Sequence, residues 1–361
     1  MAHDWLTGMR GGERVLEWLC RGFPDAPIYT LIYHPAAVSD TINAHRVRPS
    51  FLQRIPRIER HYRYWLPLFP AAISTLRAEP ADLVISTSHC VAKGLRPPRG
   101  ARHLCYCFTP MRYAWTFHDE YFGRGWKRRL AAPLLAALRR WDVAANARVD
   151  RFVTLSGHVR DRIRRFYRRD AAIVYPPVDT DFFTPGTPPP DAGTYDLIVS
   201  ALVPYKRLEI ALEAYGRLGF PLRVVGVGTE MERWRRLSPP NVAWLGRRTD
   251  EELRALYRGC RLLVFPGEED FGLVPVEAQA CGRPVVAFRR GGVCESVVDG
   301  LTGVFFDRPE ASSLADAVRQ ASALRWNPAA IRAQAETFSP QRFIDGMTRA
   351  MAECREERDP S

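Results

Sequence analysis

The chain has 361 residues, of which 46% are hydrophobic and 25% are charged. This composition is typical of a globular protein and excludes an intrinsically disordered one, and the length predicts two domains. No stretch approaches the roughly 20 uncharged apolar residues that span a bilayer. The first residues also lack the basic and apolar regions of a signal peptide. We therefore expect a cytoplasmic protein.

The eight cysteines are consistent with a reducing compartment. Six are scattered singly, Cys105 and Cys107 alternate along an apparent strand, and no pair has the spacing of a zinc or redox site. We interpret them as reduced packing residues. We expect no metal site and metal independence.

Basic residues are in excess and unevenly placed. Fifty-two Lys and Arg against 40 Asp and Glu give a net charge of +12, and arginines gather at residues 46–63, 124–129 and 160–169. Such a field attracts phosphates, nucleic acid or anionic lipid. A genome that prefers arginine to lysine would produce the same excess. None of the usual nucleic-acid recognition modules is present, so we expect no nucleic-acid partner.

Short β-rich runs alternate with longer helical segments, which predicts an α/β protein with parallel sheets. We expect strands at residues 28–33, 83–86, 103–108, 151–156 and 173–175, then at 197–201, 222–225, 242–245, 262–265 and 284–287. We expect helices at residues 208–218, 251–258, 276–281 and 341–356. Only Met1 and Ala2 precede His3, so either the first strand is very short or the true start codon lies upstream.

A proline-rich segment divides the chain. Tyr175-Pro176-Pro177 leads into a loop rich in Pro, Gly and Thr that runs to residue 190, and consecutive prolines exclude a helix there. The expected domains are residues 1–176 and 177–338, followed by a C-terminal helix and tail at 339–361. Two successive Rossmann-like halves imply a ligand cleft between them.

The most informative segment is residues 267–286, which follows a buried strand, turns at glycines and enters a helix. The N-terminus of such a helix directs free N–H groups and positive dipole at an anion. Glu269 and Glu277 lie eight positions apart, one in the turn and one in the helix. The pair suits contact with a transferring sugar and hydrogen bonding to a ribose diol. A glutamate near a helix start also commonly serves only as a cap.

This segment resembles the signature of a known family. Glu269-Asp270-Phe271-Gly272-Leu273, continued by Glu277-Ala278-Gln279-Ala280-Cys281-Gly282-Arg283-Pro284-Val285, resembles the E-x7-E pattern of the retaining glycosyltransferases of family 4. Residues 3–13, 105–115, 203–207 and 299–306 match further family segments. The resemblance is strongest to bacterial mannosyltransferases of O-antigen and exopolysaccharide assembly. It implies an α/β GT-B fold, with two Rossmann-like domains facing across a cleft and a C-terminal helix crossing back to the N-terminal domain.

The resemblance implies a role for each matching position. Glu269 would face the donor sugar, Glu277 would hold the ribose, and Lys206 would neutralise the leaving diphosphate as a second catalytic residue. Gly11 and Gly12 would let backbone N–H groups approach that diphosphate. The implied donor-binding residues are Gly11, Gly12, Arg207, Gly246, Arg247, Asp270, Phe271, Gly272, Leu273 and Glu277. A plain surface loop explains Gly246 and Arg247 equally well.

Two positions depart from the family pattern. Phe108 stands where relatives commonly carry His before Thr-Pro, and Ala201 stands where many carry Arg before the lysine. His89 and His118 are possible substitutes, although a lone His is more often structural. On the acceptor side, Arg112 and Tyr113 join His89 as candidates, and the same aromatic residues can equally belong to the core.

The resemblance implies a retaining, metal-independent hexosyltransferase of cell-surface polysaccharide biosynthesis that uses no cofactor. Its donor would be a nucleotide sugar, GDP-mannose first, and its acceptor a lipid-linked or saccharide molecule. Residues 57–65 mix cations with aromatic side chains, which favours peripheral contact with an anionic membrane at the inner face of the plasma membrane. The alternative is a catalytically silent scaffold that binds nucleotide sugars in a polysaccharide assembly complex.

Overall fold

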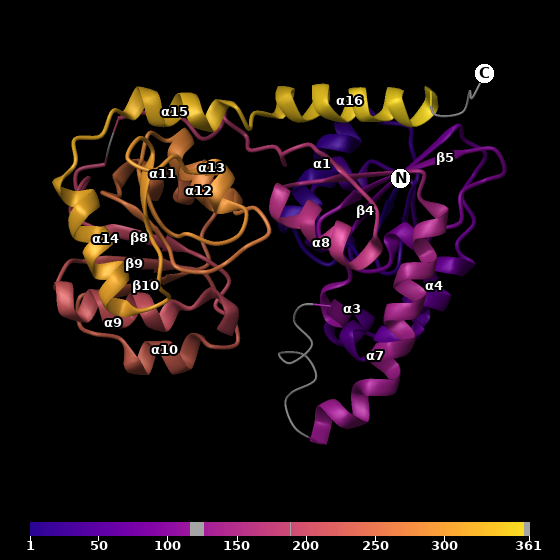
Figure 1. Ribbon diagram of the computed structural model, residues 1–361, viewed down its shortest axis with the longest axis horizontal. Coiled ribbons are helices and arrows are strands. Elements are labelled where there is room, and N and C mark those ends of the chain that lie inside the picture. Colours follow the sequence, from indigo (N-terminus) through magenta and orange to yellow (C-terminus); the bar gives the residue numbers. More distant parts are fainter. Residues whose placement is uncertain (116–125, 188, 357–361) are drawn as a thin grey trace. The chain divides into compact units, whose positions relative to one another are not determined.

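The computed structural model describes residues 1–115, 126–187 and 189–356, without the side chains of residues 126–131. His118 and Arg124 of the sequence predictions lie outside the described residues, as do the side chains of Lys127, Arg128 and Arg129. The chain divides into two compact units (Figure 1). The N-terminal unit comprises Met1–Pro176 with Phe343–Ser361, and the C-terminal unit comprises Pro177–Arg342.

The N-terminal unit is built on a parallel sheet of seven strands in the order β3-β2-β1-β4-β5-β6-β7. The strands are β1 (Ala2–His3), β2 (Ile28–Thr30), β3 (Val47–Pro49), β4 (Leu83–Ser88), β5 (Arg102–Cys107), β6 (Arg151–Thr154) and β7 (Ala172–Ile173). The sequence did not predict β3. Although β1 has only two residues, it lies between β2 and β4 and pairs with both.

Helices of the N-terminal unit connect these strands. They are α1 (Gly11–Gly22), α2 (Asp40–Asn43), α3 (Ile58–His61), α4 (Phe69–Thr75), α5 (Arg112–Trp115), α7 (Trp126–Ala144) and α8 (Gly157–Tyr167). Short 3₁₀ helices are η1 (Pro35–Ala37), η2 (Phe51–Arg54), η3 (Tyr62–Leu68), η4 (Ala92–Gly94) and η5 (Ala145–Arg148). Helix α8 shows why such segments form: Ser156 caps its N-terminus by accepting a hydrogen bond from the Val159 N–H, and Val159 and Ile163 are buried.

The C-terminal unit has a parallel sheet of six strands in the order β10-β9-β8-β11-β12-β13. The strands are β8 (Asp196–Val199), β9 (Leu222–Val225), β10 (Val242–Gly246), β11 (Leu263–Phe265), β12 (Val285–Phe288) and β13 (Gly303–Phe306). The helices are η6 (Pro204–Lys206), α9 (Leu208–Leu218), α10 (Met231–Leu237), α11 (Asp250–Gly259), α12 (Leu273–Ala280), α13 (Val293–Ser296), α14 (Ala311–Ala323) and α15 (Pro328–Glu336). Helices α9, α10 and α14 cover one face of this sheet and α11, α12 and α13 the other (Figure 1).

The last helix, α16 (Pro340–Glu356), begins in the C-terminal unit and joins the N-terminal unit from Phe343 onward. The Phe343 ring packs against Tyr106 of β5 at 5.8 Å. Gly346 lies so close to Val174 that an added Cβ would be 2.8 Å from its side chain. The predicted α/β class with two parallel sheets and a returning C-terminal helix is therefore confirmed.

We expect the N-terminal unit to lose stability as pH falls from about 6.5 to about 4. His3 and His103 are fully buried, and burial lowers the pKa of each ring from 6.5 to about 4. In this window the unfolded chain binds protons that the folded chain does not, so the free energy of unfolding rises with pH. As pH falls from about 6.5 to about 4, each buried ring lowers the free energy of unfolding by about 3 kcal/mol.

Urea denaturation at several pH values measures this dependence. His103→Asn should flatten it by removing one of the two rings. An unfolding free energy that stays constant across the window would contradict the prediction.

Candidate functional site

The strand order of the C-terminal unit reverses between β8 and β11. In open α/β sheets, ligands bind outside the carboxyl ends of the strands at such a reversal. The loop after β8 carries Lys206 and Arg207, and the loop after β11 carries Glu269. The topology therefore brings three of the predicted residues to one place.

Lys206 and Glu269 form a direct ion pair between these two loops. The Lys206 side chain is 10% exposed and that of Glu269 is 26% exposed, so the pair is largely shielded but still reachable. Gly267 permits this approach, because a Cβ there would lie 3.1 Å from the Lys206 Cα. An ammonium and a carboxylate thus lie in contact at the loop ends, where each can exchange its present partner for a group of a bound ligand.

Arg207 is held in an unusual conformation. Its backbone is left-handed, with φ of 53°, a region that non-glycine residues rarely adopt and that is common at functional sites. Its guanidinium lies over the Phe288 ring at 4.9 Å, and Nη1 is buried without a hydrogen-bond partner. An unsatisfied buried cationic donor is costly. A ligand oxygen would satisfy it.

Helix α12 begins after Gly272, whose φ of 89° suits glycine, and Leu273 is its first residue. The helix thus starts three residues earlier than predicted. Glu277 lies within it and accepts a hydrogen bond of 2.7 Å from the Tyr257 hydroxyl. Tyr257 is fully buried, and burial together with the Glu277 charge raises its pKa well above the usual value. Its hydroxyl therefore stays protonated and fixes the carboxylate.

A glycine turn holds the loop that carries Glu269. The Gly292 N–H donates to the Glu269 carbonyl at 2.9 Å. A Cβ on Gly291 would lie 2.3 Å from that carbonyl oxygen, and one on Gly292 would lie 2.3 Å from the Asp270 carbonyl oxygen. Only glycine fits at either position.

The remaining predicted donor residues are less closely grouped. Gly246 ends β10 with φ of 68°, and Arg247 follows it with an exposed side chain. The Phe271 ring is buried and packs on Phe338 at 5.4 Å, so only its backbone is presented to the loop. Gly11 and Gly12 open α1 in the N-terminal unit, and their part in donor binding stays a prediction.

The acceptor-side candidates lie in the N-terminal unit. The ring of Trp5 is 4.5 Å from that of His89 and 6.5 Å from that of Tyr113. Tyr113 is buried in the core, and Arg112 precedes it at the start of α5. Phe108 adjoins the same cluster, 6.3 Å from His89. The sequence prediction thus found two members of this cluster and missed Trp5.

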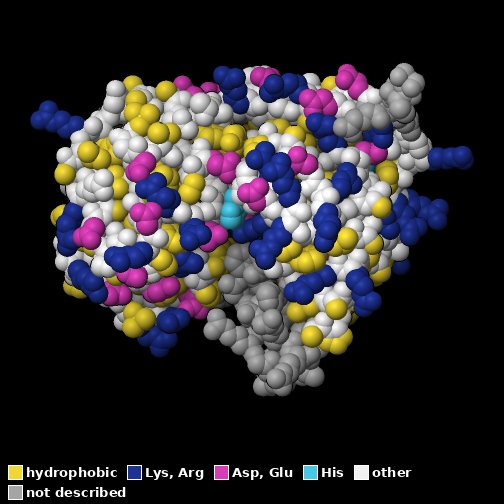
Figure 2. Space-filling model, viewed as in Figure 1, with side chains coloured by type: hydrophobic (Ala, Val, Ile, Leu, Met, Phe, Trp, Pro, Cys, Tyr) yellow, Lys and Arg dark blue, Asp and Glu magenta, His cyan; other side chains and the backbone are white. Residues whose placement is uncertain are grey.

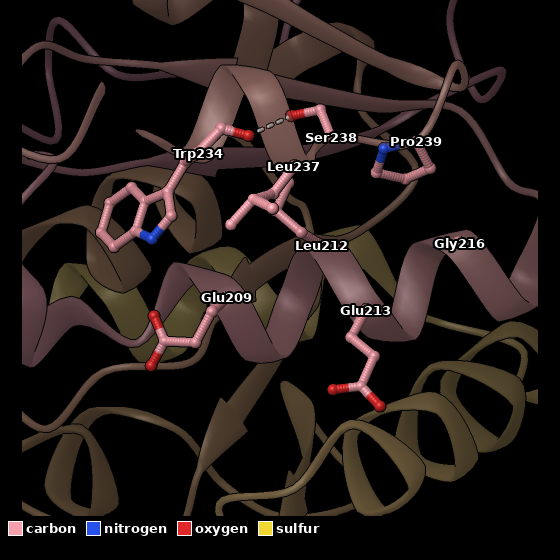
Figure 3. Close-up of a pocket in the computed structure, with 8 residues that line it drawn as sticks. All are labelled: Glu209, Leu212, Glu213, Gly216, Trp234, Leu237, Ser238 and Pro239. Atoms are coloured by element: carbon pink, nitrogen blue, oxygen red, sulfur yellow. Dashed lines mark hydrogen bonds between the residues drawn. The ribbon is translucent and has the colours of Figure 1, made fainter. Parts of the chain in front are cut away.

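A separate cavity of about 400 Å³ lies between α9 and α10 (Figure 3). It is lined by Glu209, Leu212, Glu213, Gly216, Trp234, Leu237, Ser238 and Pro239. None of these is a predicted site residue. Among the described side chains, no three His, Cys, Asp or Glu are grouped to hold a metal ion, and no described helix is long and apolar enough to cross a membrane.

Comparison with family models accounts for nearly the whole chain. Residues 9–182 match Glycosyltransferase Family 4, and residues 181–338 match Glycosyl transferases group 1. The chain belongs to the family 4-type glycosyltransferases. The finer likeness to mannosyltransferases of O-antigen assembly stays a prediction.

Curated relatives match over part of their length. D-inositol 3-phosphate glycosyltransferase of Mycolicibacterium smegmatis is 32% identical over 238 residues, covering 58% of this chain and 53% of that protein. The uncharacterized glycosyltransferase MJ1178 of Methanocaldococcus jannaschii is 27% identical over 181 residues, covering 48% and 50%. The chain spans about half the length of the curated relatives it matches.

Solved structures share the fold over almost the full chain. HepE of Anabaena in complex with UDP has a TM-score of 0.70 at 17% identity, covering 98% of this chain and 99% of that one. Sucrose-phosphate synthase of Thermosynechococcus elongatus has a TM-score of 0.68 at 18% identity, covering 99% and 98%. These likenesses confirm the predicted GT-B fold.

Proposed function

We propose that the protein is a retaining glycosyltransferase that transfers a hexose from a nucleotide-sugar donor. The observation that carries the proposal is the shielded Lys206–Glu269 ion pair at the strand reversal of the second sheet. Arg207 follows Lys206 in the same loop, and its Nη1 is buried without a hydrogen-bond partner. Two cations suit a diphosphate, and one carboxylate suits a sugar hydroxyl. A catalytically silent scaffold would have little need for Lys206, Glu269 and Glu277 together.

Each residue takes a distinct task in this proposal. Lys206 and Arg207 bind the diphosphate and stabilise the charge that builds on it as the sugar departs. The arrival of that phosphate draws Lys206 from Glu269, which is then available to the donor sugar. Glu277, fixed by Tyr257, accepts hydrogen bonds from the ribose diol.

The proposed chemistry needs no metal. The acceptor oxygen attacks the anomeric carbon on the face from which the nucleotide leaves, through a short-lived oxocarbenium-like ion pair. The bond from that carbon to the phosphate oxygen breaks, and its electron pair stays on the nucleoside diphosphate. The departing phosphate takes up the proton of the acceptor hydroxyl.

GDP-mannose is the first donor to test, and UDP-sugars are the nearest variants. HepE has been solved with UDP and with UDP-glucose, which motivates including them. We propose a lipid-linked or saccharide acceptor and a role in cell-surface polysaccharide biosynthesis.

The decisive assay offers the purified protein GDP-mannose and several UDP-sugars in the presence of EDTA. Nucleoside diphosphate release is followed with and without octyl glycosides or a lipid-linked acceptor. Release from one donor that Glu269→Ala abolishes supports the enzyme and identifies its donor. Nucleotide binding without any release would support the silent scaffold instead.

We further propose that residues 51–68 contact an anionic membrane. Phe51, Tyr64 and Leu68 are 41%, 86% and 39% exposed, and the arginines interleaved with them, Arg54, Arg57, Arg60 and Arg63, are exposed too. Exposed apolar and cationic side chains in one segment suit a lipid surface. On the face that Figure 2 shows, Lys and Arg side chains are spread among acidic and apolar ones.

Flotation with vesicles of anionic and of neutral lipid tests the contact. Binding to anionic vesicles at low salt is expected, and Tyr64→Ser with Phe51→Ser should weaken it. Absence of binding under these conditions would refute it.

A further inference from the structure

The cavity between α9 and α10 combines buried apolar side chains with exposed carboxylates (Figure 3). Leu212 and Trp234 are buried, and Leu237, which also lines the cavity, is 64% exposed. Helix α9 contributes the carboxylates of Glu209 and Glu213. Apolar surface beside carboxylates suits a ligand that joins a hydrocarbon group to a cation, and it disfavours an anion such as a nucleotide phosphate.

The end of α10 forms a fixed wall of this cavity. The Ser238 hydroxyl donates to the Trp234 carbonyl at 2.8 Å and accepts a hydrogen bond from Trp244 Nε1 at 2.9 Å. The hydroxyl therefore already has an acceptor and a donor partner within the protein. Pro239, which follows it, has no N–H group to offer. The polar chemistry of the cavity must come from its other lining residues.

A glycine keeps the space between the helices open. Gly216 lies inside α9, where glycine is less favourable than most other residues. Outside α9 itself, a Cβ at this position would have only the Pro239 side chain among the described atoms within 4 Å, the nearest at 3.6 Å. That distance is ordinary van der Waals contact, so local packing does not require glycine. A larger side chain would extend into the cavity and fill it.

The indole N–H of Trp234 supplies a second, independent observation. Trp234 is 1% exposed, and its N–H donates to no residue that the structure describes. Figure 3 shows the nitrogen edge of the ring turned toward Glu209. A buried tryptophan N–H usually has an acceptor, as that of Trp244 does. An oxygen atom of a ligand in the cavity would supply one.

Glu209 is the carboxylate that remains available to a ligand. Glu213 forms an ion pair with Arg217 on the surface of α9. Glu209 makes no ion pair or hydrogen bond with the residues that the structure describes. Its place in the first turn of α9 suits the helix dipole, but the dipole does not account for the N–H group that faces it. A hydrogen-bond donor and an anion therefore border the same cavity.

We propose that this cavity binds a small organic cation that carries an apolar group and an oxygen acceptor. The ammonium contacts Glu209, and the oxygen accepts a hydrogen bond from the Trp234 N–H. The apolar group covers Leu212 and Leu237.

The size of the cavity favours a small molecule over a protein partner. A volume of about 400 Å³ lies within the range of small-molecule sites. Its eight lining residues are far fewer than the roughly 20–30 residues that each side of a typical protein interface contributes. The site does not depend on the proposed glycosyltransferase reaction.

The probe is para-methoxyphenethylamine, which carries all three features. Para-methoxyphenethyl alcohol replaces the cation by a neutral hydroxyl, and phenethylamine lacks the ether oxygen. Indole N–H resonances of the full-length protein are followed by proton–nitrogen NMR during titration. The chain has nine tryptophans, and Trp234→Phe identifies the resonance that disappears. If that variant does not fold, Gly216→Leu, which places a side chain in the same cavity, identifies the resonance by shifting it.

We expect the amine to shift the Trp234 resonance with a Kd of about 1 mM or tighter, as befits a ligand of its size. The alcohol and phenethylamine should each bind about threefold more weakly or worse. Glu209→Gln should remove the preference for the amine over the alcohol. Glu232→Gln, at an exposed glutamate of α10 outside the lining, is the matched control and should keep it. Gly216→Leu should prevent binding while leaving α9 a good helix.

No shift of the Trp234 resonance at about ten times that amine concentration would overturn the proposal and show that water alone fills the cavity. Equal affinity of the wild-type protein for the amine and the alcohol would also overturn it. The same holds if Glu232→Gln loses the preference as Glu209→Gln does, or if Gly216→Leu binds the amine as wild type does. No readout involves nucleotide binding or sugar transfer, so failure here is distinct from failure of the turnover assay.

Discussion

Replacing Lys206 by alanine is expected to lower kcat for sugar transfer by about 10²- to 10³-fold, as loss of one preorganised group at a developing negative charge does. The Lys206 side chain is 10% exposed and its ammonium is held at the loop end by Glu269, so little reorganisation separates it from the leaving diphosphate. Steady-state turnover at saturating donor and acceptor measures the effect. A kcat within about threefold of wild type would remove Lys206 from the catalytic residues.

Glu269→Gln is the matched control for this substitution. Both variants break the same ion pair, but only Lys206→Ala removes the cation. With its competitor neutralised, Lys206 should bind a nucleoside diphosphate at least as tightly in Glu269→Gln as in wild type. In Lys206→Ala the affinity should fall by about tenfold or more. Equal weakening in both variants would mean that the ion pair is only a structural link between the loops.

Much of the candidate donor site could be predicted from sequence because its signals are local. Helix α9 spans residues 208–218 as predicted, since an amphipathic run follows Arg207 and Gly219 ends it with φ of 70°. The Glu269 loop was found from its glycines and its spacing to Glu277. The strands β3 and β13, of three and four residues, were missed as elements because such short runs carry little periodicity.

The contacts that orient the site could not be predicted, because they join residues far apart in the chain. The Tyr257 hydroxyl donates a hydrogen bond to Glu277, which lies 20 positions away in the sequence. The Asp4 carboxylate accepts hydrogen bonds from backbone N–H groups that follow β4, 85 to 88 positions away. Nothing in the local pattern of either residue distinguishes it from an ordinary helix or strand end. Phe271 is the opposite case: the motif predicts that it binds the donor, but its ring packs in the core against Phe338.

The second large effect is expected from Asp142→Ala, which should lower the free energy of unfolding by about 3–5 kcal/mol. Asp142 Oδ1 lies 2.8 Å from the Lys93 ammonium, and both side chains are buried. Oδ2 accepts hydrogen bonds from Trp115 Nε1 at 2.7 Å and the Tyr167 hydroxyl at 2.8 Å. Removing the carboxylate leaves the buried ammonium without a counter-ion, although it keeps the Asp142 carbonyl and Asn146 Oδ1 as acceptors, and it leaves two other donors without their partner. Urea denaturation followed by tryptophan fluorescence measures the loss.

Asp170→Ala is the control, because Asp170 makes an equally well-formed pair with Arg164 at 2.9 Å, but on the surface. That exposed pair should contribute little to the free energy of unfolding, because solvent screens it. A similarly small loss for Asp142→Ala would show that water or repacking compensates the buried ammonium.

The Asp142 substitution should also affect the acceptor side. Lys93 directly follows Ala92, the last residue whose N–H group the Asp4 carboxylate accepts. The segment from His89 to Lys93 is therefore held at one end by a buried anion and at the other by a buried cation. Loosening the second anchor should raise the acceptor KM under conditions where the variant remains folded. If stability falls while the acceptor KM stays unchanged, the Asp4 contacts alone are sufficient to position His89.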